Sequence, residues 1–326
     1  MNYLINRHTD PYFNMAFDEY CLNHEIGDGP LCYLWQNRPA VIVGANQQIH
    51  TEVDVNYLKE HDIVLARRVT GGGAVYHDWG NLNYTIVGEV KEMERDYPEY
   101  ACLMQQALCE LGVPATLSGR NDILVDGLKV SGFAKRVAKG RIMVHGTLMY
   151  DVDVEVLSKA LTPPAAKLQT KGIASVRSRV GNLKPYLPHI ADIDGMRSAL
   201  LRILSRGYTD KEVCIGEKGM AEIEKLAKEK FADWHWIYGH SPQATLTQSA
   251  RLKCGNVTVH LQLSKGVIAN CTFEGDFLGN LPISEVEEAL VGVAYEHSLL
   301  AKQLAKLNIA AYLDGVTDKE LLKLII

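Results

Sequence analysis

The stretch RRVTGGGAVYHD, residues 67–78, decides the interpretation of this chain, because two arginines lead directly into three consecutive glycines. It follows a short apolar run at 63–66, which is typical of a buried strand. Consecutive glycines can turn their backbone N–H groups inward, and guanidinium groups bind phosphate or carboxylate through paired hydrogen bonds. The stretch therefore predicts an anion site. The simpler alternative is a glycine turn between two strands with surface arginines beside it.

The composition is that of an ordinary globular protein, with 47% hydrophobic and 22% charged residues among 326. One compact core rarely holds a chain of this length, so we expect a large domain and a smaller one. The net charge of −5, from 34 Lys and Arg against 39 Asp and Glu, offers no general attraction for nucleic acid or an anionic membrane. We expect neither as a partner, and any basic site must be local.

The seven cysteines contain no Cys-x-x-Cys pair, so they predict neither a disulfide framework nor a zinc site. The first residues lack a charged region followed by an apolar run, and no window reaches 18 apolar residues. We therefore expect reduced thiols and a cytoplasmic protein.

Apolar patterning predicts an α+β fold, with mixed and antiparallel sheets flanked by helices over residues 1–243. Asp10-Pro11 is a typical helix start, and Asp126-Gly127 is a typical hairpin turn. A second helix is expected over 98–111, and strands are expected over 31–35, 41–43, 63–66, 84–90, 123–130 and 141–150.

The second half of the chain predicts a long loop and then a small separate domain. Prolines punctuate 162–195, which we expect to be an irregular loop. Thr209-x-x-Glu212 predicts the start of a helix over 211–230. Residues 244–326 then predict a small α+β domain, with turns at Gly255-Asn256 and Lys265-Gly266 and with helices capped by Ser284-x-x-Glu287 and Thr317-x-x-Glu320.

Lys129 lies on a predicted strand just before Ser131-Gly132, where a close backbone approach is possible. A rigidly held ammonium can stabilise charge that develops on a phosphate, whereas the simpler alternative is a solvated lysine at the end of a hairpin. Asp122 enters the same hairpin and is a candidate either to orient Lys129 or to hold Mg²⁺; the alternative is a local cap.

Together these stretches resemble the lipoate-protein ligase A family over almost the whole chain. The resemblance rests on several separated motifs in the family's order, at 10–16, 67–81, 119–122, 129–134, 145–147 and 175–179. It implies a catalytic domain of the biotin and lipoate ligase type at 1–243 and a small C-terminal accessory domain at 244–326.

The resemblance also implies an ATP-dependent, monomeric ligase that converts lipoate to lipoyl-AMP and transfers the lipoyl group to a lysine of a carrier protein. The implied carriers are acyltransferase subunits of 2-oxoacid dehydrogenases and the glycine-cleavage H protein. Lys129 is the implied catalytic residue, Mg²⁺ is expected with ATP, and Asp122 is its candidate ligand. The residues implied to bind ATP are Arg68, Gly73, Ala74, Val75, Tyr76 and Lys129. Those implied to bind lipoate or its adenylate are Gly71, Gly72, His77, Lys129, Ser131, Gly132, His145, Ser175, Val176 and Arg177.

The nearest alternative is an octanoyl- or lipoyl-transferase of the same fold, which forms a thioester on a cysteine and uses no ATP. This chain has no cysteine between Cys109 and Cys214, where such a nucleophile is expected. We therefore favour the ligase. Thr70, Tyr76 and Phe133 depart from the residues common in the family, which leaves the choice between lipoate and octanoate open.

Overall fold

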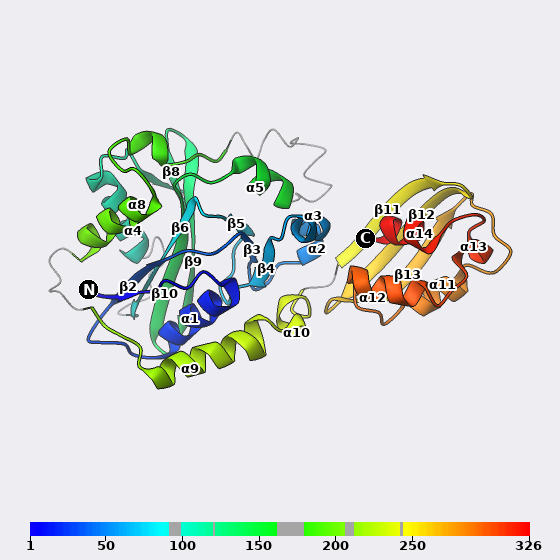
Figure 1. The fold of residues 1–326 in the computed structure, drawn as a ribbon, viewed down its shortest axis with the longest axis horizontal. Coiled ribbons are helices and arrows are strands. Elements are labelled where there is room, and N and C mark those ends of the chain that lie inside the picture. Colours follow the sequence, from blue (N-terminus) through cyan, green and yellow to red (C-terminus); the bar gives the residue numbers. More distant parts are fainter. Residues whose placement is uncertain (91–98, 120, 162–178, 206–211, 242–243) are drawn as a thin grey trace. The chain divides into compact units, whose positions relative to one another are not determined.

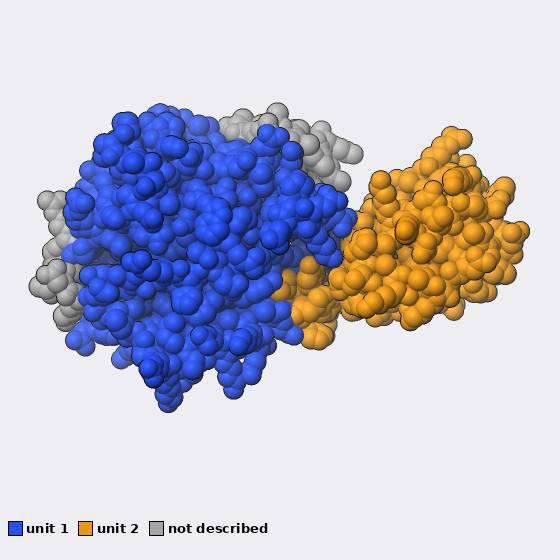
Figure 2. Space-filling view, viewed as in Figure 1, with its two compact units in different colours: residues 1–233 blue, residues 234–326 orange. Residues whose placement is uncertain are grey.

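A computed structural model describes residues 1–90, 99–119, 121–161, 179–205, 212–241 and 244–326 (Figure 1). The chain divides into two compact units, Met1–Asp233 and Trp234–Ile326, which Figure 2 colours separately. The short helix α10 (Trp234–Ile237) belongs to the second unit. A Cβ atom on Gly266 would lie only 2.9 Å from the Trp234 ring, so α10 packs on the turn at 265–266.

The first unit contains a seven-stranded mixed sheet with the order β1-β2-β6-β10-β9-β8-β7. β1 pairs with β2 in parallel, and all the other neighbours in this sheet are antiparallel. The strands are β1 (Asn2–Ile5), β2 (Leu31–Trp35), β6 (Asn81–Glu89), β7 (Thr116–Ser118), β8 (Asp122–Val125), β9 (Leu128–Ala138) and β10 (Arg141–Met149).

A second sheet of three strands has the order β4-β3-β5. β3 (Ala40–Val43) pairs in parallel with β4 (Val64–Arg67) and antiparallel with β5 (Val75–His77). The glycine stretch thus connects β4 to β5 across the central strand. The patterning missed β5, because it is only three residues long and directly follows the glycines.

Helices cover both faces of the large sheet. α4 (Glu99–Glu110) and α8 (Ile193–Leu204) contribute to the main core with one face, while α1 (Pro11–Asn23) contacts β6, β10 and β4 and is flanked by α9 (Glu217–Leu226). The shorter helices are α2 (Ile49–Glu52), α3 (Val55–Glu60) and α5 (Val154–Ala160), with a 3-10 turn at Lys184–Tyr186 and a π-helical turn at Ala227–Phe231.

The second unit is an antiparallel sheet of β11 (Ala244–Leu252), β12 (Gly255–Ser264) and β13 (Val267–Gly275). It has a core of its own, to which alternate residues of β12, such as Val259 and Leu261, contribute. Its helices are α11 (Ser284–Leu290), α12 (His297–Leu304), α13 (Ile309–Tyr312) and α14 (Asp318–Ile325). No described helix of either unit is both long and apolar enough to cross a bilayer.

The predicted α+β architecture is confirmed, as are several local signals. Asp10 caps α1 by accepting a hydrogen bond from the Phe13 N–H, and Asp126 and Gly127 have the positive φ values, 49° and 80°, of a tight hairpin turn. Thr317 and Glu320 form the expected capping box.

Three local predictions are wrong, each because another contact takes the residue concerned. The helix expected over 211–230 begins only at Glu217, since Glu212 forms a parallel bridge to Tyr3; Thr209 lies outside the described residues. The turn expected at Gly255-Asn256 lies two residues earlier, at 253–254, and Gly255 already pairs with Leu252. Ser284 forms no capping box, since Glu287 accepts a hydrogen bond from the Phe273 N–H of β13. Of the loop expected over 162–195, residues 162–178 lie outside the described residues, and α8 begins within the rest, at Ile193.

Candidate active site

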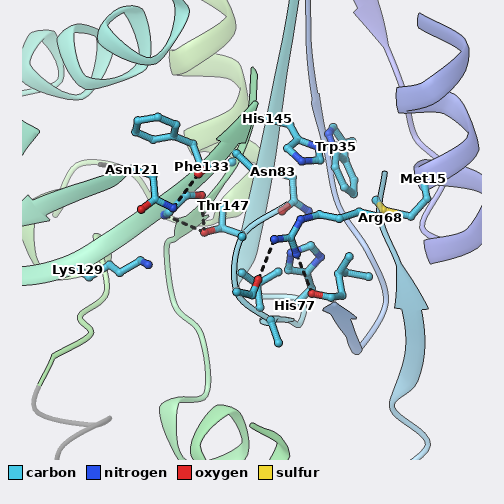
Figure 3. A pocket seen from close by; sticks show the side chains of 18 residues that line it. Met15, Trp35, Arg68, His77, Asn83, Asn121, Lys129, Phe133, His145 and Thr147 are labelled. Carbon is cyan, nitrogen blue, oxygen red and sulfur yellow. Dashed lines mark hydrogen bonds between the residues drawn. The ribbon is translucent and has the colours of Figure 1, made fainter. Parts of the chain in front are cut away.

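A pocket of the first unit lies between the three-stranded sheet β4-β3-β5 and one face of the seven-stranded sheet (Figure 3). Strand alternation explains its composition: Leu82 and Tyr84 of β6 face the main core, whereas Asn83 between them faces the pocket. The lining residues are Met15, Trp35, Ile42, Arg68, Gly72, Gly73, Ala74, Val75, His77, Asn83, Asn121, Lys129, Gly132, Phe133, Ala134, His145, Gly146 and Thr147.

Arg68 holds the glycine loop from inside. Its Nη2 donates hydrogen bonds to the carbonyls of Gly71 and Gly73 at 2.7 and 2.8 Å, and its Nη1 donates to the Ile42 carbonyl at 3.0 Å. Its Nε donates to Thr70 Oγ1 at 2.9 Å. Burial lowers the pKa of Arg68 to about 10, so the side chain stays cationic at neutral pH. The alternative of surface arginines is wrong, because Arg68 is only 6% exposed and Arg67 is fully buried.

Arg67 and Gly44 fix the outer side of the same loop. Arg67 Nη1 donates to the carbonyls of Gly44 and Gln47 at 2.8 and 2.9 Å. A Cβ atom on Gly44 would lie 2.2 Å from the Gly72 carbonyl oxygen, so only glycine permits this approach. Gly72 itself has a φ of 93°. Arg68 holds the carbonyls of the loop, and Arg67 holds those of the adjoining segment at 44–47 against which the loop lies. The loop is thereby preorganised to offer backbone N–H groups to an anion.

A β-bulge turns Lys129 toward the pocket. Ile123 of β8 pairs with Ser131, whereas Leu124 pairs with Lys129, so Val130 is an extra residue on β9. The bulge puts the Lys129 side chain on the same face of β9 as Gly132. A Cβ atom added to Gly132 would lie 2.9 Å from Lys129 Nζ. Lys129 Nζ forms an ion pair of 2.8 Å with Asp122 Oδ1, and both side chains are about one-third exposed, at 37% and 34%.

Residues 179–181, which follow the segment 162–178, pair with the backbone of Lys129. The Lys129 N–H donates to the Arg179 carbonyl at 2.7 Å, and the Gly181 N–H donates to the Lys129 carbonyl at 3.0 Å. Val180 thereby forms a parallel bridge with Lys129. Ser175, Val176 and Arg177 lie outside the described residues, but the chain that leaves them is held at the candidate catalytic lysine.

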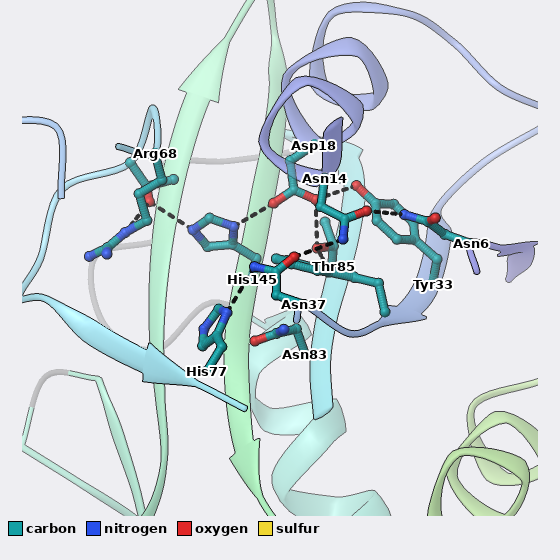
Figure 4. A network of polar contacts seen from close by, with 12 residues as sticks. Asn6, Asn14, Asp18, Tyr33, Asn37, Arg68, His77, Asn83, Thr85 and His145 are labelled. Carbon is teal, nitrogen blue, oxygen red and sulfur yellow. Dashed lines mark hydrogen bonds and ion pairs between the residues drawn. The ribbon is translucent and has the colours of Figure 1, made fainter. Parts of the chain in front are cut away.

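A buried chain of hydrogen bonds joins α1 to the glycine loop (Figure 4). Asp18 Oδ2 accepts from His145 Nδ1 at 2.7 Å, and its Oδ1 accepts from Tyr33 and Thr85. His145 Nε2 lies 2.7 Å from Thr70 Oγ1, which in turn accepts from Arg68. Asp18 was not predicted as a site residue, although Asn14 and Asp18, two polar residues four apart on an otherwise apolar helix face, were a usable signal.

His77 lies in the same wall and is almost fully buried. Burial, assisted by the Arg68 guanidinium, lowers its pKa from 6.5 to about 3, so the imidazole is neutral at physiological pH. Its Nδ1 lies 3.0 Å from Asn37 Nδ2, while its buried Nε2 has no hydrogen-bond partner among the described residues.

The structure brings most of the predicted residues together. The predicted residues that line the pocket are Arg68, Gly72, Gly73, Ala74, Val75, His77, Lys129, Gly132 and His145. Gly71, Tyr76 and Ser131 do not line it, and the Ser131 side chain is fully buried on the other side of β9. Among the described residues no group of three His, Cys, Asp or Glu side chains could hold a metal ion, so Asp122 lies next to Lys129 without other metal ligands.

Comparison with known proteins identifies both units. Residues 10–205 match the family model of the lipoyl protein ligase A/B catalytic domain, and residues 241–325 match that of the bacterial lipoate protein ligase C-terminus. Lipoate-protein ligase LplJ of Bacillus subtilis is 39% identical over 321 residues, which cover 97% of each chain.

Two solved structures each match 72% of this chain. A bi-partite lipoate protein ligase of Thermoplasma acidophilum, described together with its lipoyl domain, matches with a TM-score of 0.65 and 30% identity over 72% of this chain and 95% of that one. A lipoate-protein ligase A bound with ATP matches with a TM-score of 0.63 and 29% identity over 72% and 97%. The family matches therefore cover the pocket and the small unit alike, and the chain belongs to the lipoate-protein ligase family.

Proposed function

We propose that this protein is an ATP-dependent lipoate-protein ligase whose active site is the pocket between the two sheets. The observation that carries the proposal is the meeting of Lys129, Gly132 and the loop held by Arg68 in one pocket of a member of this family. A relative of known structure binds ATP, and the relatives are named for ligating lipoate to protein.

In the first step a lipoate carboxylate oxygen attacks the α-phosphorus of ATP. The bond from this phosphorus to the bridging oxygen breaks, and pyrophosphate leaves with the electron pair. Lys129 would stabilise the negative charge that builds up on the α-phosphate and orient the acyl carbonyl, while the N–H groups of the loop from Gly71 to Tyr76 would receive the nucleotide phosphates. In the second step the amine of a carrier lysine attacks the acyl carbonyl, an amide forms and AMP leaves.

Neither step requires a protein nucleophile, so positioning and charge stabilisation account for the catalysis. Asp122 would be the candidate carboxylate for a Mg²⁺ ion bound together with ATP, since such an ion needs only one or two protein carboxylates. The ion would neutralise phosphate charge. Ser175, Val176 and Arg177, which lie outside the described residues, remain our candidates to bind the adenylate; the described chain that follows them is hydrogen-bonded to Lys129.

The carriers we propose are lipoyl domains of 2-oxoacid dehydrogenase acyltransferase subunits and the glycine-cleavage H protein. The Thermoplasma relative is described with a lipoyl domain, which supports this class of partner. We also propose that the protein acts as a monomer in the cytoplasm, whose reducing conditions suit its seven free cysteines.

The competing transferase mechanism needs a cysteine that reaches the acyl group. None of the seven cysteines lines the pocket, and Cys109 and Cys214 are exposed elsewhere. The geometry therefore favours the ligase. A transferase would move an acyl group between carriers without ATP, whereas we expect no carrier modification when ATP is left out.

Replacing Lys129 tests the proposal. We expect Lys129→Ala to lower lipoate-dependent exchange of pyrophosphate into ATP about 100-fold or more, because a preorganised cation at the developing charge is lost. Lys135→Ala, at an exposed lysine of the same strand, is the matched control. Circular dichroism would show whether both variants are folded, and full exchange by folded Lys129→Ala would refute the assignment.

A further inference from the structure

A second hollow of the first unit, of about 440 Å³, is lined by the chain that follows β1 and by the helix α8. Residues 7–9 and Gln36 line one side of it, and the residues at 194, 197, 198 and 201 line the other. The spacing of the latter is that of one helix face. Among the described residues, none lines both this hollow and the active-site pocket. The two are therefore separate sites.

Hydrogen bonds to other elements hold the wall that follows β1. The Asn14 Nδ2 group of α1 donates to the His8 carbonyl at 2.9 Å, and the Arg38 N–H group donates to the Thr9 carbonyl at 2.9 Å. The backbone that carries Arg7 is therefore fixed, and this side of the hollow is formed without a ligand.

Arg197 enters the hollow from α8 and is incompletely paired. Its Nη2 donates to Gln36 Oε1 at 3.1 Å, and the Gln36 amide is itself oriented because its Nε2 donates to the Trp79 carbonyl at 2.8 Å. Arg197 Nε is buried without a hydrogen bond in the described part of the chain, and Asp194 Oδ1 lies 3.6 Å from it. Since the Asp194 side chain is 83% exposed, solvent weakens this ion pair.

A second guanidinium, that of Arg7, faces the same hollow. Arg7 is exposed and forms no hydrogen bond or ion pair with the residues that the structure describes. Burial lowers the pKa of Arg197; of the neighbouring charges, Asp194 raises this pKa and Arg7 lowers it. The two arginines thus repel each other, and one solvated carboxylate opposes two positive charges. In a chain of net charge −5, this is a local excess of positive charge at a concave surface.

We propose that this hollow binds a dianionic phosphate group between Arg7 and Arg197. A phosphate group carries close to two negative charges at neutral pH and several acceptor oxygens, which match the unused N–H donors of two guanidinium groups. The hollow has the size of a small-molecule site, so it also has room for the organic part of a phosphate ester. The site goes beyond the proposed function, because it uses no residue of the active-site pocket.

Nuclear magnetic resonance of the isotope-labelled full chain tests the site. Inorganic phosphate and glycerol 3-phosphate are each titrated at constant ionic strength, with sodium chloride as the reference salt, and the backbone amide signals of residues 7–9 and 197–198 are followed. We expect saturable shifts with both phosphates and none with chloride. Tighter binding of the ester would assign the site to phosphorylated metabolites, whereas equal binding would assign it to free phosphate.

Arg7→Gln and Arg197→Gln locate the bound group. We expect each to weaken phosphate binding about tenfold, because each removes a charge-assisted contact. Arg202→Gln replaces an exposed arginine of α8 that does not line the hollow, and this control should bind like the unaltered protein. The amide spectrum of each variant also shows whether it is folded.

Shifts that grow without saturation, or that sodium chloride reproduces, would overturn the inference. So would unchanged phosphate affinity in both variants, since the phosphate would then be bound elsewhere, for example at the glycine loop. Should Arg197→Gln fail to fold, Arg7→Gln decides, because Arg7 is exposed. Each of these results leaves the proposed ligase activity untouched.

Discussion

At the scale of single residues, the site depends on polar groups that are removed from water and paired. Asp18 is 1% exposed and accepts from three side chains, which compensates the burial of its charge. Arg68 is held in the same way by carbonyls. Such groups were hard to predict, because an arginine next to glycines in a sequence does not reveal whether it binds an external anion or the loop itself.

The depressed pKa of His77 predicts acid sensitivity. In the folded protein the pKa values of His77 and His50 are about 3, so both imidazoles stay neutral well below pH 6.5. In the unfolded chain the same two side chains become protonated below pH 6.5. Stability present above pH 6.5 is therefore lost as the pH falls toward 3, at a cost of about 2 kcal/mol per histidine at pH 5. Urea unfolding at pH 7 and pH 5 measures this loss.

The variant His77→Asn should lose less stability between these two pH values, by about the share of one histidine. His297→Asn replaces an exposed histidine and is the control, which should behave like the unaltered protein. An identical loss in His77→Asn and the unaltered protein would contradict the assignment of a neutral, buried imidazole.

At the scale of elements, the sequence predicted strands and turns well and their detailed register poorly. The Asp126-Gly127 hairpin was predictable because its φ values demand those residue types. The bulge at Val130 was not, because Lys129 and Gly132 share a face only when one residue of β9 is left unpaired. Met15 and Trp35 were likewise missed as lining residues, since apolar side chains in a core and in a pocket have the same pattern.

The bulge yields a prediction for Gly132→Ala. The new methyl group would lie 2.9 Å from Cε and Nζ of Lys129, and the flexible lysine can move away at little energetic cost. We expect the free energy of unfolding to change by less than about 1 kcal/mol, while pyrophosphate exchange falls about 10- to 100-fold because the ammonium is displaced.

Gly216→Ala is the matched control, since nothing lies within 4 Å of its new methyl group. Chemical denaturation and the exchange assay, applied to both variants, separate stability from positioning. An unaltered exchange rate in Gly132→Ala would mean that the observed placement of Lys129 is not required for activation.

At the scale of the whole molecule, each unit has its own hydrophobic core. The sequence indicated two domains through the change to alternating strands after residue 244, but it did not associate α10 with the small unit. That contact depends on Trp234 meeting Gly266, a pair too far apart in the sequence for local patterns to connect. Local sequence patterns do not predict long-range packing contacts of this kind.

The separate core predicts that residues 234–326 fold alone. Leu261, Leu300 and Leu321 are fully buried within this unit, and its length is in the range of independent domains. We expect the isolated fragment to unfold cooperatively in urea, followed by circular dichroism. Leu261→Ala in the fragment should cost about 2–5 kcal/mol, and a broad transition insensitive to that change would contradict an independent fold.

The reciprocal hydrogen bonds between Lys129 and the returning chain at 179–181 make two backbone amides into local reporters. The Lys129 amide and the Gly181 amide exchange with deuterated solvent only when this pairing opens. The hydrogen–deuterium exchange rate at these two positions, compared with and without bound acid and nucleotide, therefore measures how often the pairing between Lys129 and residues 179–181 opens. It does so without any label or substitution in the pocket.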